Sequence, residues 1–162
     1  EKKYKNEERI LCPSPKVATY DLKPEMSSDE VTKNVIREIK KGKFEFICLN
    51  FANPDMVGHT GDFNAAVKAC EAVDNHLGKI IDEASNKDYT SIVIADHGNC
   101  ERMINHDGSI NTSHTINPVP IILVNSENKE INNGVLADIA PTILDILGIE
   151  TPIEMEGESL LI

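Results

Sequence analysis

Two short apolar runs and the amphipathic stretch between them constrain the fold of this chain more than any other feature. The runs cover residues 44–52 and 90–95, and each has the length and composition of a buried β-strand. The stretch between them repeats apolar residues every three or four positions, which predicts a helix with one continuous buried stripe. The stripe consists of Phe63, Ala66, Cys70, Val73, Leu77, Ile80 and Ala84. Strands that alternate with helices are typical of an α/β layer fold with a largely parallel sheet.

The flanking segments predict elements of the same kinds. Residues 27–30 have the Ser-x-x-Glu form of a capping box, so a helix is expected to begin there and to end at Gly42. Residues 119–124 predict a third strand, and a last helix is expected within residues 138–148. These elements are few for a doubly wound sheet, which indicates that part of the sheet lies outside this chain.

Length and charge narrow the classes of function. The 162 residues fit one domain, and the formal net charge is −11. This charge argues against nucleic acid or an anionic membrane as a partner, because either needs a basic face. A phosphorylated substrate remains compatible with the charge, since a bound metal ion can invert its sign locally.

The cysteines and the first residues indicate a cytoplasmic protein. None of the four cysteines, Cys12, Cys48, Cys70 and Cys100, forms a Cys-x-x-Cys pair, so we predict free thiols in a reducing compartment. Residues 1–9 are charged, unlike a signal peptide.

Carboxylates and imidazoles follow the predicted strands. Asp96 and His97 come directly after the run 90–95, at the end of a strand where ligands gather in open α/β sheets. Gly98 then permits a sharp turn of the backbone. The adjacent Asp96 and His97 can diverge at a strand end, so that each serves a different ion.

A second pattern, Asp-x-x-x-His, follows the first predicted strand at Asp55 and His59. Pro54 before the pattern and Gly58 within it favour a loop rather than a helix, and a loop can fold both groups around one ion. His114 lies shortly before the third predicted strand.

Together these two Asp and three His side chains suit a divalent metal, with Mn²⁺ and Zn²⁺ both compatible with mixed oxygen and nitrogen ligands. Two such ions a few ångströms apart can clamp the attacking and leaving oxygens of a phosphoryl transfer. The alternative, an α/β domain in which these residues coincide without a metal, stays open on the residues alone.

Long segments of the chain resemble the cofactor-independent (2,3-bisphosphoglycerate-independent) phosphoglycerate mutases of the alkaline phosphatase superfamily. The resemblance rests on residues 13–26, 50–61, 95–99, 114–115, 117–120 and 138–142. It implies a three-layer alkaline phosphatase-like α/β sandwich with a mostly parallel sheet that is incomplete in this chain. Residues 1–162 would then be the C-terminal segment of the discontinuous phosphatase domain, without its N-terminal strands and inserted transferase domain.

The resemblance also implies an activity and a ligand set. The family interconverts 3-phosphoglycerate and 2-phosphoglycerate in glycolysis and gluconeogenesis, through a phosphoserine and with two Mn²⁺ ions. By motif, Asp55, His59 and His114 resemble the ligands of one ion. Asp96 and His97 resemble ligands of the other.

Two functional segments of the family have no counterpart in these residues: the one with the nucleophilic serine and the one with a further metal-ligand aspartate. We therefore assign no catalytic residue to this chain and expect it to be inactive alone. Its expected partner is the N-terminal part of the same enzyme, and self-association through an unpaired sheet edge is an alternative. Another metalloenzyme of the superfamily, such as a phosphatase or phosphopentomutase, and a non-catalytic metal-binding module remain as other interpretations.

Overall fold

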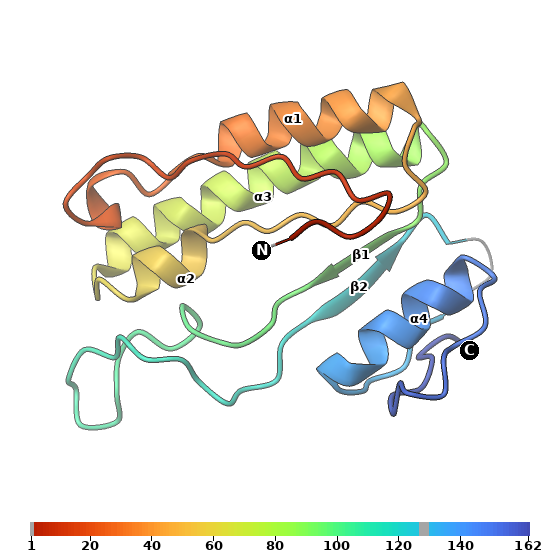
Figure 1. Cartoon of the computed structure of the whole chain (residues 1–162). Coiled ribbons are helices and arrows are strands. Elements are labelled where there is room, and N and C mark those ends of the chain that lie inside the picture. The colour runs from red at the N-terminus through yellow and green to blue at the C-terminus, as the bar shows by residue number, and fades with distance from the viewer. Residues whose placement is uncertain (1, 127–129) are drawn as a thin grey trace.

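The computed structural model describes residues 2–126 and 130–162, and these form three layers (Figure 1). A small sheet of β1 (Ser91–Ile94) and β2 (Ile121–Val124) lies between helices α1 and α3 on one side and helix α4 on the other. The helices are α1 (Ser28–Lys41), α2 (Asn53–Gly58), α3 (Phe63–Ser85) and α4 (Ile139–Ile146), with short 3₁₀ turns η1 (Tyr20–Leu22) and η2 (Leu136–Asp138). The predicted α/β class is confirmed. No helix in the described part of the chain is long and apolar enough to cross a membrane.

The residues that begin and end the helices match the sequence predictions at some positions and not at others. Gly42 ends α1 in the left-handed conformation, with φ of 60°, and Asp62 begins α3 by accepting a hydrogen bond of 2.9 Å from the Ala65 amide. The predicted capping box at the start of α1 is wrong. The hydroxyl of Ser27 donates instead to the carbonyl of Pro13, 2.6 Å away, so it ties the preceding loop to the helix.

The predicted strand 44–52 is an extended segment without a strand partner among the described residues. It runs in the same direction as β1 in Figure 1, and its side chains at Ile47, Leu49 and Phe51 pack against the α1–α3 pair. The apolar run therefore correctly predicts that these side chains are buried, but helices can bury them as well as a sheet can. A strand additionally needs a hydrogen-bonding neighbour, and sequence cannot show whether one is present.

The sheet itself differs from the expected parallel arrangement. β1 and β2 are antiparallel, with Ser91 opposite Val124 and Ile94 opposite Ile121, and they are the only paired strands in residues 2–126 and 130–162. β1 therefore keeps one unpaired edge in the described chain, which agrees with the expectation of an incomplete sheet.

Asp138 anchors the C-terminal segment rather than capping α4. Its carboxylate accepts hydrogen bonds from the backbone amides of Val135, at 2.8 Å, and Glu158, at 3.1 Å. These two donors lower the pKa of Asp138 below its ordinary value, because they favour the ionised carboxylate.

We expect the Asp138 contribution to the free energy of unfolding to disappear in acid. Because the folded-state pKa of Asp138 is lowered, its contribution is complete above about pH 5 and is lost as the pH falls through the folded-state value. Denaturant unfolding of the parent and Asp138→Asn proteins between about pH 6 and pH 2 measures this. The difference in stability between the two proteins should shrink towards low pH. A difference that stays constant over this range would contradict the assignment.

Candidate metal centre

Asp55 and His59 are positioned by helix α2, and not by the loop that the sequence predicts. Pro54 occupies the first turn of α2, where its missing N–H costs no hydrogen bond, and Gly58 is the last helical residue. His59 follows as the C-terminal cap, so the spacing of four residues places both side chains on one face of the helix. The expectation of a loop is wrong because Pro54 starts the helix instead of interrupting it.

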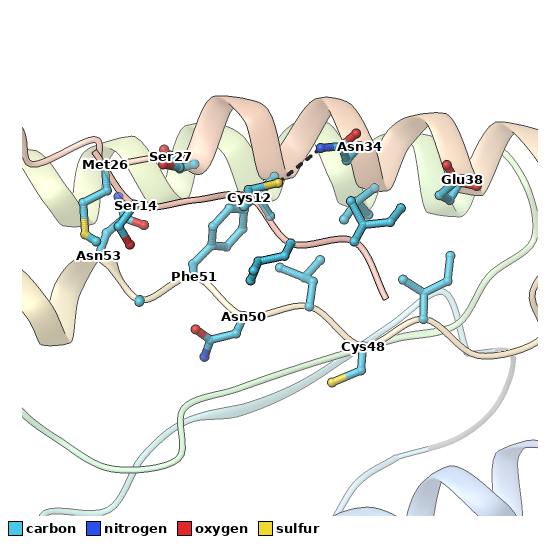
Figure 2. A pocket seen from close by; sticks show the side chains of 18 of the residues that line it. Cys12, Ser14, Met26, Ser27, Asn34, Glu38, Cys48, Asn50, Phe51 and Asn53 are labelled. Carbon is cyan, nitrogen blue, oxygen red and sulfur yellow. Dashed lines mark hydrogen bonds between the residues drawn. The ribbon is translucent and has the colours of Figure 1, made fainter. Parts of the chain in front are cut away.

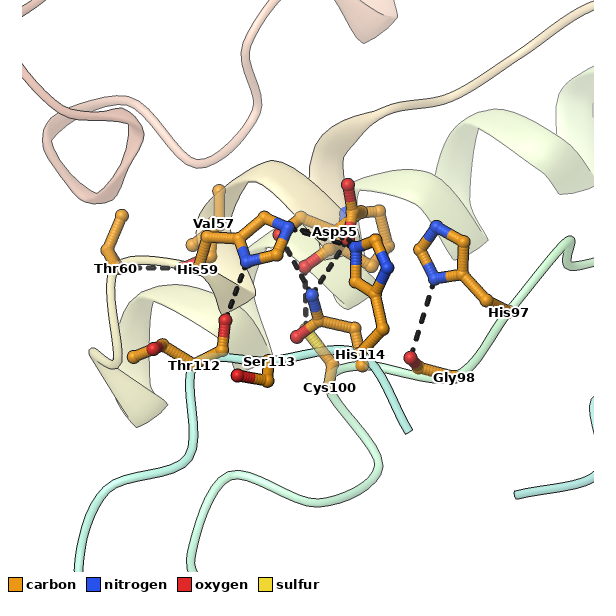
Figure 3. Close-up of polar contacts among 12 residues, drawn as sticks. Asp55, Val57, His59, Thr60, His97, Gly98, Cys100, Thr112, Ser113 and His114 are labelled. Carbon is orange, nitrogen blue, oxygen red and sulfur yellow. Dashed lines mark hydrogen bonds and ion pairs between the residues drawn. The ribbon is translucent and has the colours of Figure 1, made fainter. Parts of the chain in front are cut away.

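A short backbone bridge between Gly98 and Thr115 positions His114 near α2. The amide of Thr115 donates to the carbonyl of Gly98 at 2.8 Å, which pairs the residues after His97 and His114. As a result the imidazoles of His97 and His114 stack, with ring centroids 3.7 Å apart and planes inclined by 20° (Figure 3).

Three ligand atoms converge where α2 meets this bridge (Figure 3). Oδ1 of Asp55 lies 3.2 Å from Nε2 of His59 and 3.0 Å from Nε2 of His114. The two Nε2 atoms are 3.1 Å apart. All three side chains keep part of their surface in solvent, so an ion can reach them.

The backbone fixes which nitrogen of His59 faces the cluster. Nδ1 of His59 lies 2.6 Å from the carbonyl oxygen of Thr112, and a carbonyl can only accept, so Nδ1 carries the hydrogen. In the neutral ring Nε2 then presents its lone pair to Asp55 and His114. This arrangement, with the second nitrogen held by a backbone carbonyl, is common for histidines that bind metals.

The distances within the triad fit a shared cation. Around an ion with metal–nitrogen bonds of about 2.1 Å, neighbouring ligand atoms lie about 3.0–3.4 Å apart in octahedral or tetrahedral geometry. The three observed separations are 3.0, 3.1 and 3.2 Å. Lone pairs of a carboxylate and two imidazoles at these distances repel one another unless a cation or a proton lies between them.

Asn99 holds the carboxylate of Asp55 in place. Its Nδ2 donates to Oδ1 of Asp55 at 2.8 Å, and the Asn99 residue is only 5% exposed. The close approach depends on Gly58, because a Cβ there would overlap the side-chain oxygen of Asn99 and come within 2.9 Å of Sγ of Cys100. Sequence shows the glycine but not the neighbour that requires it.

Glu101 supports the loop that carries His114. Its carboxylate accepts hydrogen bonds from the hydroxyl of Thr115 and, at 2.8 Å, from the amide of Asn117. The hydrogen bond from Thr115, followed by that from Asn117, lowers the pKa of Glu101. Thr115 adjoins His114, so the loop is held at the residue next to this candidate ligand.

Asp96 and His97 lie beside the triad but not within it. Nε2 of His97 is 3.7 Å from Oδ2 of Asp96, and the Asp96 side chain is 76% exposed. In the described part of the chain, Asp55, His59 and His114 form the only group of three or more such residues whose ligand atoms all lie within 4.8 Å of one another. The carbonyl of Thr112 is the contact that sequence reasoning missed, and backbone groups leave no sequence signal that could have revealed it.

Comparison with known proteins places this geometry in a family. A family model described as the metalloenzyme superfamily matches residues 1–151. The chain is 61% identical over 158 residues to the 2,3-bisphosphoglycerate-independent phosphoglycerate mutase of Flavobacterium johnsoniae, covering 98% of this chain and 31% of that protein. It is 57% identical over 164 residues to such a mutase, numbered 2, from Methanosarcina barkeri, again covering 31% of it.

A solved structure shares the fold. The chain superposes on Leishmania mexicana phosphoglycerate mutase, determined at low cobalt concentration, with a TM-score of 0.84 and 33% sequence identity. The match covers 93% of this chain and 31% of that one, so the chain spans about a third of the length of these relatives. Because the family model covers nearly all of the sequence, the chain belongs to the metalloenzyme superfamily.

Proposed function

We propose that this chain is the metal-binding C-terminal segment of the phosphatase domain of a 2,3-bisphosphoglycerate-independent phosphoglycerate mutase. The single observation that carries the proposal is the convergence of Asp55, His59 and His114 within a shell of 3.0–3.2 Å. The names of its relatives support phosphoglycerate mutase activity. The proposed reaction of the whole enzyme is the interconversion of 3-phosphoglycerate and 2-phosphoglycerate, in cytoplasmic glycolysis and gluconeogenesis.

In this proposal the triad holds one divalent ion, and Asp96 and His97 contribute to a second. Mn²⁺ is the preferred ion, with Zn²⁺ as the alternative, because mixed carboxylate and imidazole ligands suit both. The cobalt present with the Leishmania mexicana enzyme supports a divalent transition metal. Such ions supply positive charge to the phosphoryl group and to the oxygens that attack and leave it.

In this proposal the residues of this chain bind the metal ion and orient its ligands, and the rest of the enzyme supplies the nucleophile. Thr112 and Asn99 fix the directions of the His59 ring and the Asp55 carboxylate. The serine that becomes phosphorylated, a further aspartate ligand and the side chains that bind phosphoglycerate are placed outside these 162 residues. Accordingly, the first metal site is complete in this chain and the second is not.

Calorimetric titration of the purified chain with Mn²⁺ tests this division. We expect one tightly bound ion per chain and a second that binds much more weakly, because Asp96 and His97 lack their third protein ligand. We also expect no turnover of 3-phosphoglycerate in a coupled assay. Two equally tight ions, or turnover by the chain alone, would contradict the proposal.

The N-terminal part of the same enzyme is the partner that this chain is proposed to need. β1 has one unpaired edge in the described chain, and the segment 44–52 has no strand partner there. Between residues 8–14, α1 and residues 44–53 lies a largely apolar cavity of about 410 Å³ (Figure 2). Open strand edges next to uncovered apolar surface favour association with another chain segment.

Without that partner, we expect the isolated chain to self-associate. The free edge of β1 and the segment 44–52, neither of which has a strand partner there in the described chain, can pair with those of a second copy. Sedimentation velocity over a wide range of protein concentration should show a mass that rises with concentration. A monomer at every concentration would contradict this expectation.

A further inference from the structure

The turn after β1 and the segment before β2 each carry one of the stacked histidines, His97 and His114. An isolated backbone bridge pairs the two segments, and in it the amide of Thr115 donates to the carbonyl of Gly98 at 2.8 Å. Because this bridge lies outside β1 and β2, no ladder of neighbouring pairs holds it in register. A further contact is therefore needed to fix the two segments relative to each other.

The side chain of Glu101 supplies this contact. Its Oε1 accepts a hydrogen bond from the hydroxyl of Thr115 and another, at 2.8 Å, from the side-chain amide of Asn117. A Cβ added at Gly98 would overlap both Oγ1 of Thr115 and Oε1 of Glu101, so the glycine leaves the space in which these two side chains meet. Glu101 thus ties the turn that carries His97 to the segment that carries His114.

We propose that Glu101 is a positioning residue that fixes the stacked imidazoles of His97 and His114, and through them both proposed ion sites. The ring centroids are 3.7 Å apart, and Nδ1 of His97 lies 3.4 Å from the Gly98 carbonyl to which Thr115 donates. A displacement of Thr115 therefore disturbs both rings. Where it concerns the ions, this inference rests on the proposed function.

An oxygen acceptor at this position, rather than a negative charge, carries the role. Both hydrogen bonds end on Oε1, so the side-chain oxygen of a glutamine can accept both. Glu101, Thr115 and Asn117 all keep some exposed surface, so water can replace the carboxylate as their partner. Loss of the Glu101 side chain should therefore disturb the histidines while it leaves the stability of the fold nearly unchanged.

Nuclear magnetic resonance of the histidine ring protons in the metal-free chain tests the positioning. Stacked rings shift the signals of each other's protons away from those of a free histidine. We expect Glu101→Ala to move the signals of His97 and His114 towards the free values, and Glu101→Gln to leave them nearly unchanged. His106, an exposed loop histidine outside the triad, is the internal control. Unchanged signals in Glu101→Ala, or equal changes in the two variants, would overturn the proposal.

Thr115→Val is a second variant that probes the same contact from the other side. Valine keeps the shape of the side chain and lacks the hydroxyl that donates to Glu101. We expect the signals of His97 and His114 to move in the same direction as in Glu101→Ala. The double variant should move them little further, because both changes remove one shared hydrogen bond. Fully additive changes would show that Glu101 does not act through Thr115.

Calorimetric titration with Mn²⁺ tests the consequence for the ion. We expect the dissociation constant of the tightly bound ion to rise about tenfold in Glu101→Ala and to stay close to the parent value in Glu101→Gln. Glu150→Ala removes the same charge from an exposed glutamate after α4 and should change nothing. Equal constants in the parent and Glu101→Ala would overturn the effect on the ion. A parent chain that binds no Mn²⁺ would instead contradict the proposed function, and the ring signals would still test the positioning.

Discussion

Replacement of His114 by alanine is expected to weaken Mn²⁺ binding by at least about 100-fold. Loss of a supporting contact already costs about 10- to 100-fold in affinity, and His114 is proposed as a direct ligand. Its Nε2 lies 3.0 Å from Asp55 Oδ1 and 3.1 Å from His59 Nε2, so the variant keeps only two of the three converging ligand atoms. Calorimetry gives the affinity directly.

His106→Ala provides the matched control. His106 is also an exposed loop histidine, but it lies outside the triad. Its replacement should leave Mn²⁺ affinity unchanged, and circular dichroism of both variants checks that the fold is intact. An equal loss of Mn²⁺ affinity in the two variants, or full affinity in His114→Ala, would show that the triad does not bind the ion.

Gly58→Ala is expected to weaken Mn²⁺ binding about 10- to 100-fold although it touches no ion. A Cβ at Gly58 overlaps the side-chain oxygen of Asn99, so the amide that donates to Asp55 must move away. Alanine is the better helix former by about 1 kcal/mol, so helix propensity alone predicts no harm. The expected loss therefore isolates the contact between α2 and Asn99.

Gly78→Ala is the control for that change. Gly78 lies within α3 and has open space where a Cβ would be added. We expect stabilisation of about 0.5–1 kcal/mol by denaturant unfolding and no change in Mn²⁺ affinity. If Gly58→Ala binds Mn²⁺ as tightly as Gly78→Ala, Asn99 does not position Asp55.

Local signals in the sequence were sufficient for much of the fold. Asp62 and Gly42 mark helix ends because the side chain of the first and the backbone freedom of the second act on their immediate neighbours. The continuous buried stripe predicted for α3 is only partly confirmed, because Ala66, Ile80 and Ala84 are buried whereas Phe63 and Cys70 are exposed. The segment 44–52 shows the limit, since its apolar pattern is real but a strand exists only where another strand pairs with it.

The candidate site also has a part that the sequence predicts and a part that only the tertiary fold shows. Asp55, His59 and His114 are predicted from the sequence, and the structure brings their ligand atoms together. Asp96 and His97 are predicted too, but the structure places only His97 in contact with the triad, through its stacking on His114. The Thr112 carbonyl that orients His59 comes from the tertiary fold, and no residue type encodes it.

Anomalous X-ray diffraction from crystals grown with Mn²⁺ locates the ion directly. We expect a strong anomalous peak about 2.0–2.3 Å from Asp55 Oδ1 and from the Nε2 atoms of His59 and His114. A peak elsewhere on the molecule with these three side chains unliganded, or no peak in Mn²⁺-saturated crystals, would contradict it.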